Sequence, residues 1–271
     1  MMAERTIRVA TIAPRTPSWI QPHRIILIMI AIVMVTATMF LMRWDWILEY
    51  YGLLLQGFLC ALWMLVVTAT LGFLLAIPLG FAQVNGSAWL SAFAKVFCTI
   101  IRGTPLLLQI WIFYYGFGSI FPQHPLIRHS VLWPYLRQAW PYAVLALTLS
   151  FAGYVGEIMR GAFAGVPRGQ LEAARAYGMS RTKIFHRIWL PQAIYRVLPT
   201  LAGETVMLLK STPLVATISV MEIFAVSEKV RQDTFLTYEP LLLLAVIYMA
   251  MTGVIILLFR RIESRIPAGL I

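Results

Sequence analysis

The sequence predicts an all-α integral membrane protein. Of its 271 residues, 60% are hydrophobic and 12% are charged, and the mean hydropathy is +0.79. A soluble domain carries about 25% charged residues, so this composition is typical of a chain that crosses the bilayer several times. No polar stretch is long enough for a separate soluble domain. The net charge of +11 would indicate nucleic acid in a soluble protein. Here the cations flank apolar segments, which indicates membrane topology instead.

Six segments come close to or exceed the roughly 20 residues that a helix needs to cross the hydrocarbon core. The first, 25–42, and the last, 240–259, contain no charged residue. Residues 50–94 are also uncharged and are too many for one crossing, so the Asn-Gly-Ser sequence at 85–87 is predicted to turn the chain. The predicted spans are 25–42, 53–81, 93–118, 139–160, 197–221 and 240–259.

The distribution of Lys and Arg predicts the orientation of these spans. With the N-terminus in the cytoplasm, 15 of the 22 cations fall in inner segments and 5 in outer loops. The positive-inside rule therefore predicts that both termini and the segment 160–196 are cytoplasmic. We expect three parts: an N-terminal tail with an extra first span (1–45), a transmembrane domain (46–265) and a short tail (266–271).

The stretch EAARAYGMSRTKIFHRIWLP, residues 172–191, is the most informative one in the chain. Pro167 suits the first turn of a helix, residues 168–177 contain three alanines, and Gly178 suits a left-handed helix ending. Ser180 can cap the helix that follows. The sequence therefore predicts a short surface helix with a small-residue face that another protein can approach closely. From spacing alone, an ordinary amphipathic connector at the membrane surface is the alternative.

Position for position, this stretch resembles the EAA loop of ATP-binding cassette (ABC) importer permeases. Glu172, Ala173 and Ala174, with Gly178 four residues on, carry the resemblance. Other segments resemble the polar amino acid subfamily of these permeases, most closely the subunits that serve histidine, lysine, arginine and ornithine or the opines. These segments are 55–80, 101–118, 152–178 and 208–224, and the resemblance extends over about residues 50–265. Members often have five spans with the N-terminus outside, so residues 1–45 are an addition.

The resemblance implies a six-helix transmembrane bundle of the type I, MetI-like kind with a cytoplasmic coupling helix in an EAA loop at about 167–191. In that family the loop docks into a separate ATPase. The residues expected to couple to the ATPase are Gln170, Glu172, Ala173, Ala174 and Gly178.

The same resemblance implies the partners and the cargo. The chain would pair with a second permease, identical or homologous, with two ATPases that bind the ATP and Mg²⁺, and with a periplasmic solute-binding protein. The solute would be a polar, basic amino acid or an opine, imported across the bacterial inner membrane. The chain itself would bind no cofactor.

Two similar heptamers, IRGTPLL (101–107) and LKSTPLV (209–215), interrupt apolar spans. Proline removes a helical hydrogen bond, and the threonine before it can cap a restarted helix. Paired breaks of this kind point to a transport path near the midplane, and charges inside a span usually face protein or water. Candidate path residues are Arg102, Thr104, Glu204, Lys210 and Thr212. Packing kinks and structural bonds between helices are the alternative. Glu157 is expected to pair with Arg160.

Catalytic and metal-binding patterns are missing from the sequence. There is no GxxxxGKS or GxxxxGKT phosphate loop, and the four histidines lack metal spacing. The chain is therefore expected to be a transport subunit without its own nucleotide site, with no metal and no nucleic acid partner. A self-contained secondary transporter or channel is the main alternative, but such a carrier does not need an EAA loop. An integral membrane enzyme is a weaker one.

Overall fold

The computed structural model describes residues 22–266, and every regular element among them is a helix. The chain divides into two units, Met1–Trp46 and Ile47–Ile271. In the first unit, α1 (Pro22–Leu41) is a helix over the predicted first span. Most of the predicted N-terminal tail, residues 1–21, lies outside the described residues. The same holds for residues 267–271 of the predicted C-terminal tail.

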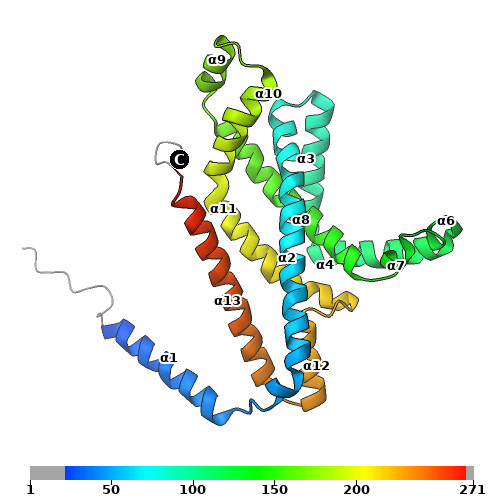
Figure 1. Cartoon of the computed structure of the whole chain (residues 1–271), viewed down its shortest axis with the longest axis vertical. Helices are drawn as coiled ribbons and strands as arrows, with labels where there is room; N and C mark the ends of the chain where they lie inside the picture. Colours follow the sequence, from blue (N-terminus) through cyan, green and yellow to red (C-terminus); the bar gives the residue numbers. More distant parts are fainter. Residues whose placement is uncertain (1–21, 267–271) are drawn as a thin grey trace, which may run out of the picture. The chain divides into compact units, whose positions relative to one another are not determined.

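Three helices of the second unit are long and apolar enough to cross a membrane (Figure 1): α2 (Trp46–Asn85), α8 (Trp140–Gly165) and α13 (Tyr238–Glu263). The α2 helix has 40 residues, or about 60 Å at 1.5 Å per residue, so it is longer than the hydrocarbon core of about 30 Å. It packs closely on α8, because a Cβ added at Gly80 would lie 2.6 Å from the Met159 Cβ. The predicted turn at 85–87 is confirmed, and the Ser87 side chain caps the next helix.

Two bent pairs complete the set of candidate crossings, giving up to five in the described residues. In the first pair, α3 (Ala88–Gly103) is followed by α4 (Leu106–Trp111) and its continuation to Gln123 at an angle of 103°. The span predicted over 93–118 is therefore not one straight helix but is broken, at the Thr-Pro sequence where the break was expected. The reason is Pro105, which cannot continue the helix hydrogen bonds of α3.

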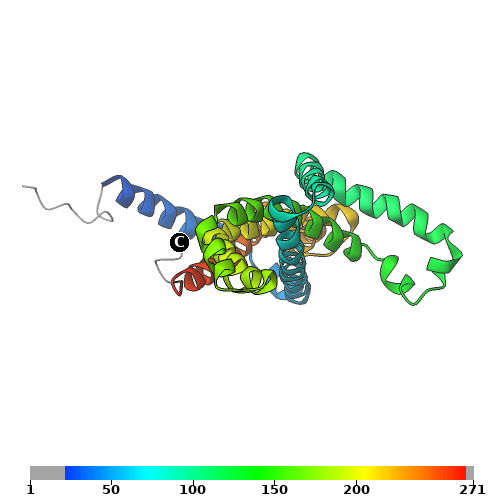
Figure 2. The same cartoon turned by 90° about the horizontal axis from the view of Figure 1, so that it is seen from above.

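The chain from α4 to α8 forms an arm that projects from the helix bundle in both views (Figures 1 and 2). Beyond α4, the arm contains the π-helix η2 (Ile112–Phe117), α5 (Gly118–Ile120), the 3-10 helix η3 (Phe121–Gln123), α6 (Pro125–Arg128) and α7 (Trp133–Leu136). Stacked rings of Phe113, Phe117 and Phe121 run along it.

The second bent pair follows a surface helix, α9 (Arg168–Ala176). It consists of α10 (Arg181–Ile184), η4 (Phe185–Trp189), α11 (Leu190–Ser211), η5 (Thr212–Ile218) and α12 (Ile223–Thr234). The bend is 53°. It contains Ser219 at a φ of +64°, and it ends at Glu222, whose side chain caps α12.

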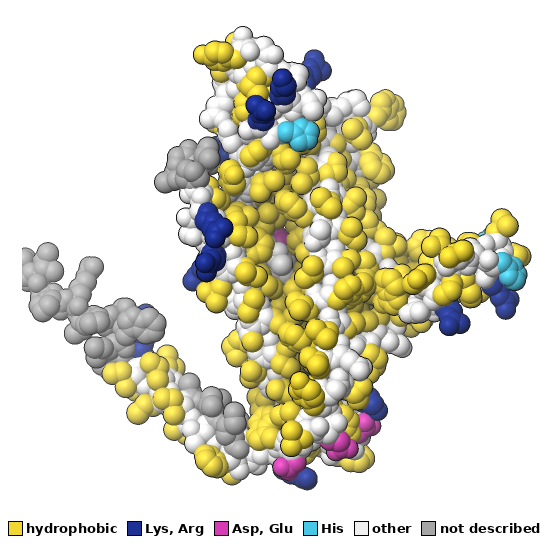
Figure 3. Space-filling model, viewed as in Figure 1, with side chains coloured by type: hydrophobic (Ala, Val, Ile, Leu, Met, Phe, Trp, Pro, Cys, Tyr) yellow, Lys and Arg dark blue, Asp and Glu magenta, His cyan; other side chains and the backbone are white. Residues whose placement is uncertain are grey.

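The helix α8 is the centre of the second unit. In its most apolar window 67% of the residues are buried, against 11% for α13. Small residues such as Ala143, Ala146 and Ala152 are fully buried there, which lets α3 and α11 approach. Figure 3 shows a broad hydrophobic surface between two polar ends. Cations gather near α9 and α10 and at the end of α13, and carboxylates visible in this view lie mostly near α12.

Candidate functional site

The helix α9 ends at Ala176 and is closed by Gly178, as the sequence predicts. This glycine has a φ of +75°. Its N–H donates to the Arg175 carbonyl at 2.9 Å, and the Met179 N–H donates to the Ala174 carbonyl at 3.1 Å. This pair of bonds is a Schellman ending, which needs a left-handed residue at the glycine position. Ser180 then caps α10 by accepting from the Lys183 N–H, so that prediction is also confirmed.

One face of α9 is buried and the other is open. Leu171 and Ala174 are buried, whereas Glu172 and Ala173 are exposed. The predicted small-residue face is therefore divided, because helical spacing turns Ala174 inward and Ala173 outward. Tyr177, which the sequence prediction did not single out, is 89% exposed beside this open face. A large aromatic residue directly before the loop glycine was the signal that could have identified it.

The α9 segment is tied firmly to the helices beneath it. The Gln192 amide of α11 donates to the Gln170 side chain at 2.6 Å. Below the loop, the Trp189 indole donates to the Phe163 carbonyl at 2.9 Å. The Phe81 ring of α2 packs on Trp189, Phe163 and Phe185, with a shortest centroid distance of 4.6 Å. These rings come from α2, α8 and η4, so they pack the three elements together beneath α9.

The candidate path charges and the Glu157–Arg160 pair belong to α3, α8 and α11. The Arg102 guanidinium lies 5.7 Å from the centre of the Tyr154 ring, and its positive charge acts on the Glu204 carboxyl. The expected Glu157–Arg160 pair is confirmed, with an N–O distance of 2.6 Å. Lys210 is exposed. Arg102 of α3 and Glu204 of α11 thus lie close enough to interact, and Glu157 and Arg160 pair within α8.

The two threonines of the heptamers are the C-caps of α3 and α11, and neither side chain caps the helix that follows. The Thr104 hydroxyl donates to the Ile100 carbonyl at 2.9 Å, and no side chain caps α4. The Gln109 amide, which sequence reasoning missed, donates to the Ile101 carbonyl, the Thr104 carbonyl and the Thr104 hydroxyl at 2.8, 3.0 and 2.8 Å. The expectation that Thr104 caps the restarted helix is wrong, because its hydroxyl donates back to the Ile100 carbonyl of α3. Gln109 gives the Ile101 carbonyl the donor that Pro105 lacks.

Thr212 is fully buried and belongs to a polar chain inside the bundle. Its hydroxyl donates to the Leu209 carbonyl and lies 3.1 Å from the Tyr248 hydroxyl. The Tyr248 hydroxyl donates to Glu222 Oε2 at 3.1 Å, and Glu222 Oε1 accepts from the Ala225 N–H at 3.0 Å. Glu222 and Tyr248 were missed by sequence reasoning. Thr212 therefore does not cap η5 as expected, and the chain joins η5, α12 and α13.

Three comparisons with known proteins match this architecture. Residues 69–267 match the family of binding-protein-dependent transport system inner membrane components. This chain belongs to that family. It is a permease component of an ABC importer, and a multi-pass protein of the inner membrane. The prediction of a type I, MetI-like helical fold is confirmed.

The permease is similar to named proteins over most of its length. It is 41% identical to the octopine transport system permease protein OccM of Rhizobium radiobacter over 78% of this chain and 84% of that protein. It is 33% identical to the histidine/lysine/arginine/ornithine permease protein HisM of Salmonella typhimurium over 82% and 93%.

Solved structures show the same arrangement of helices. A crystal structure of an amino acid ABC transporter with histidines has a TM-score of 0.68 at 27% identity, and the match covers 83% of this chain and 100% of that one. An inward-facing MetNI methionine transporter has a TM-score of 0.65 at 17% identity over 80% and 97%, which supports the fold alone.

Proposed function

We propose that this permease imports a polar amino acid, basic in character, or an opine, and that a separate ATPase drives it by docking on α9. The observation that carries the proposal is the open face of α9, where Glu172, Ala173 and Tyr177 are exposed while Leu171 anchors the helix below. The names of its relatives, which include octopine and histidine permeases, support the solute class.

The remaining components follow from the same proposal. ATP and Mg²⁺ bind to two ATPase subunits, because this chain contains no phosphate-loop motif. Gln170, Ala174 and Gly178 hold the coupling helix in place, and Glu172 and Ala173 meet the ATPase. A second permease and a periplasmic solute-binding protein complete the importer. Both termini are cytoplasmic, with α1 as an extra span, because 15 of the 22 cations then lie inside.

Copurification tests this function directly. The tagged permease, expressed with its genomic neighbours, is expected to copurify with an ATPase chain, and the purified complex should hydrolyse ATP faster when the loaded binding protein is added. A permease that purifies alone and transports in vesicles without ATP would instead support a self-contained secondary transporter.

The charged groups of α3 and α11 are proposed to line the path, at an interface with the second permease. Arg102 and Lys210 would meet the carboxylate that all amino acids share, and Glu204 would meet the cationic end of a basic solute. Thr104 and Thr212, whose hydroxyls bond to helix carbonyls, maintain the two helix breaks beside the path.

Charge replacement distinguishes a path from a structural bond. Glu204→Gln is expected to weaken apparent affinity for a cationic amino acid about tenfold, the equivalent of ~1.4 kcal/mol, with a smaller effect for a neutral one. Lys210→Met should weaken both equally, and the exposed Lys95→Met serves as the matched control. The measurement is uptake at normal protein abundance. Lower abundance with unchanged kinetics in both variants would remove these residues from the path.

A further inference from the structure

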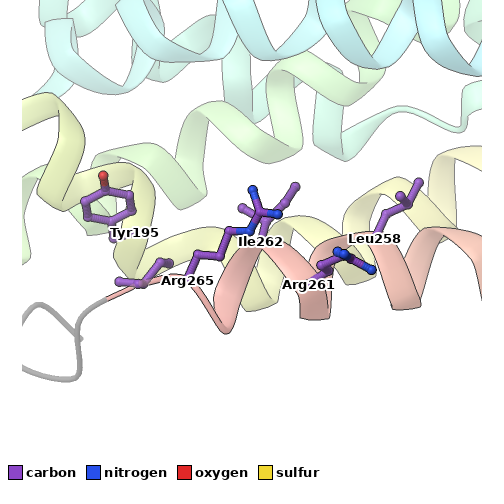
Figure 4. A pocket seen from close by; sticks show the side chains of 6 residues that line it. Tyr195, Leu258, Arg261, Ile262 and Arg265 are labelled. Carbon is purple, nitrogen blue, oxygen red and sulfur yellow. The ribbon is translucent and has the colours of Figure 1, made fainter.

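A pocket of about 370 Å³ lies at the C-terminal end of α13, beside the start of α11 (Figure 4). Its lining combines two arginines and a tyrosine with aliphatic side chains. The lining residues are Tyr195, Leu258, Arg261, Ile262, Arg265 and Ile266. Tyr195 comes from α11 and the others from α13 or just beyond it, so the pocket bridges two helices.

The two arginines of this pocket are exposed and face it together. Arg261 and Arg265 are four residues apart, which places them on one side of the chain as it leaves α13. Within the described residues neither forms an ion pair, although Glu263 lies between them in sequence. A guanidinium presents five donors in a fork that matches phosphate oxygens, and the Tyr195 hydroxyl is a further donor. The pocket is therefore suited to an oxyanion such as a phosphodiester.

A long apolar groove adjoins the pocket. It has a volume of about 780 Å³ and runs between α2, α11 and α13. Its walls are almost entirely hydrocarbon, and Leu258 lines both the groove and the pocket. Representative wall residues are Leu65, Phe73, Leu198, Leu201, Met251 and Ile255. An anion site at the end of a helix thus continues into an apolar channel along that helix.

This groove is distinct from the proposed transport path. Neither Glu204 nor Lys210 lines the groove. At about 100° per residue, Lys210 lies about 180° around α11 from the groove residue Leu201, and Glu204 lies about 60° from it, so the groove and the candidate path charges share no lining residue. The occupant of the groove therefore does not need to be the transported solute.

We propose that the pocket and the groove together bind one anionic phospholipid. Its phosphate lies between Arg261, Arg265 and Tyr195, and an acyl chain lies in the groove below Leu258. Charge complementarity at the pocket and an apolar surface along the helix match the two ends of such a lipid, and basic pockets between transmembrane helices are suited to anionic head groups. The lipid would join α13 to the start of α11, the helix that follows α9 and α10. The inference rests on the membrane location of the permease and not on its solute.

The test uses the full-length permease with its copurifying subunits in detergent. Phosphatidylglycerol is added in increasing amounts, and bound lipid is counted by native mass spectrometry. Arg265→Gln is expected to weaken phosphatidylglycerol binding about tenfold. Arg260→Gln removes the same charge from the same exposed turn, but Arg260 does not line the pocket, so it should leave binding unchanged.

A second matched pair of variants tests the groove. Ala250 lines it, whereas Ala245, also exposed on α13, does not. Ala250→Trp is expected to displace the acyl chain and lower retention of the lipid, and Ala245→Trp should not. Melting without lipid checks that each variant is folded. Added phosphatidylglycerol should raise the melting temperature of the parent and of Ala245→Trp but not that of Ala250→Trp.

Several outcomes would overturn the proposal. Equal loss in Arg260→Gln and Arg265→Gln would indicate general attraction to a charged surface. Equal binding of phosphatidylcholine would mean that the head group is not recognised. Competition by glycerol phosphate as strong as that by the lipid would identify a free-anion site. Equal retention in both tryptophan variants would exclude the groove. The lipid measurements do not depend on ATPase copurification. A permease that purifies without an ATPase would therefore contradict the proposed function, and the lipid proposal would still be decided by the lipid results.

Discussion

Gly178→Val is expected to lower solute uptake at least tenfold while the permease still inserts into the membrane. The residue has a φ of +75°, where an L-amino acid costs roughly 1–2 kcal/mol and a β-branched one more. A Cβ at this position would meet no atom within 4 Å, so the effect comes from the backbone and not from a clash. The loop would abandon its Schellman ending and move the open face of α9 away from the ATPase.

Gly178→Asn is the matched control for this prediction. Asparagine tolerates the left-handed region better than other non-glycine residues, so it should keep most of the uptake, with Gly178→Ala between the two. The measurements are uptake in cells, membrane abundance, and the amount of ATPase that copurifies. If valine and asparagine behave alike, backbone conformation at Gly178 does not control coupling.

Glu222→Leu is expected to destabilise the permease by about 2–4 kcal/mol. The change removes the N-cap of α12, which contributes roughly 0.5–2 kcal/mol, and leaves the Tyr248 hydroxyl without its buried acceptor, at roughly 1–3 kcal/mol. Glu222 is 0% exposed, so water cannot replace the lost bond. The measurement is the thermal melting midpoint of the purified permease in detergent.

Tyr248→Phe provides the comparison, because it removes only one hydroxyl group and keeps the N-cap of α12. Glu222 keeps the Ala225 N–H and Thr212 keeps the Leu209 carbonyl, so a loss of only ~1 kcal/mol is expected. The double variant should be less destabilised than the sum of the two single variants, because no hydroxyl is then left unpaired. Fully additive losses, or Glu222→Leu melting like the parent, would contradict the proposed hydrogen-bond chain.

The features that follow from local chemistry were predictable from the sequence. Gly178, Ser180 and the turn at 85–87 act through their own backbone or through neighbours within a few residues. Apolar length similarly indicated the helices, since burying backbone groups in lipid requires helical hydrogen bonding. The EAA pattern placed the surface helix at 168–176 because capping and helix propensity act over a single turn.

The geometry of the bend after α3 could not be predicted from neighbouring residues. Pro105 indicated a break, but the 103° angle and the role of Gln109 depend on how α4 leaves α3 and packs beside α8. The inward position of Ala174 was likewise decided by the helices packed beneath α9 and not by the sequence of the loop.

The sequence by itself therefore determined the membrane class, the family resemblance and the surface helix that ends before Gly178, since each depends on composition or on neighbouring residues. The tertiary structure alone decided which polar groups meet across distant segments. Glu222 and Tyr248 are 26 residues apart, and Thr212 and Tyr248 are 36 apart. Tyr195, Arg261 and Arg265 line one pocket only because α11 and α13 lie together. No helical or turn periodicity extends over such separations, so these contacts arise only from the packing of one helix against another.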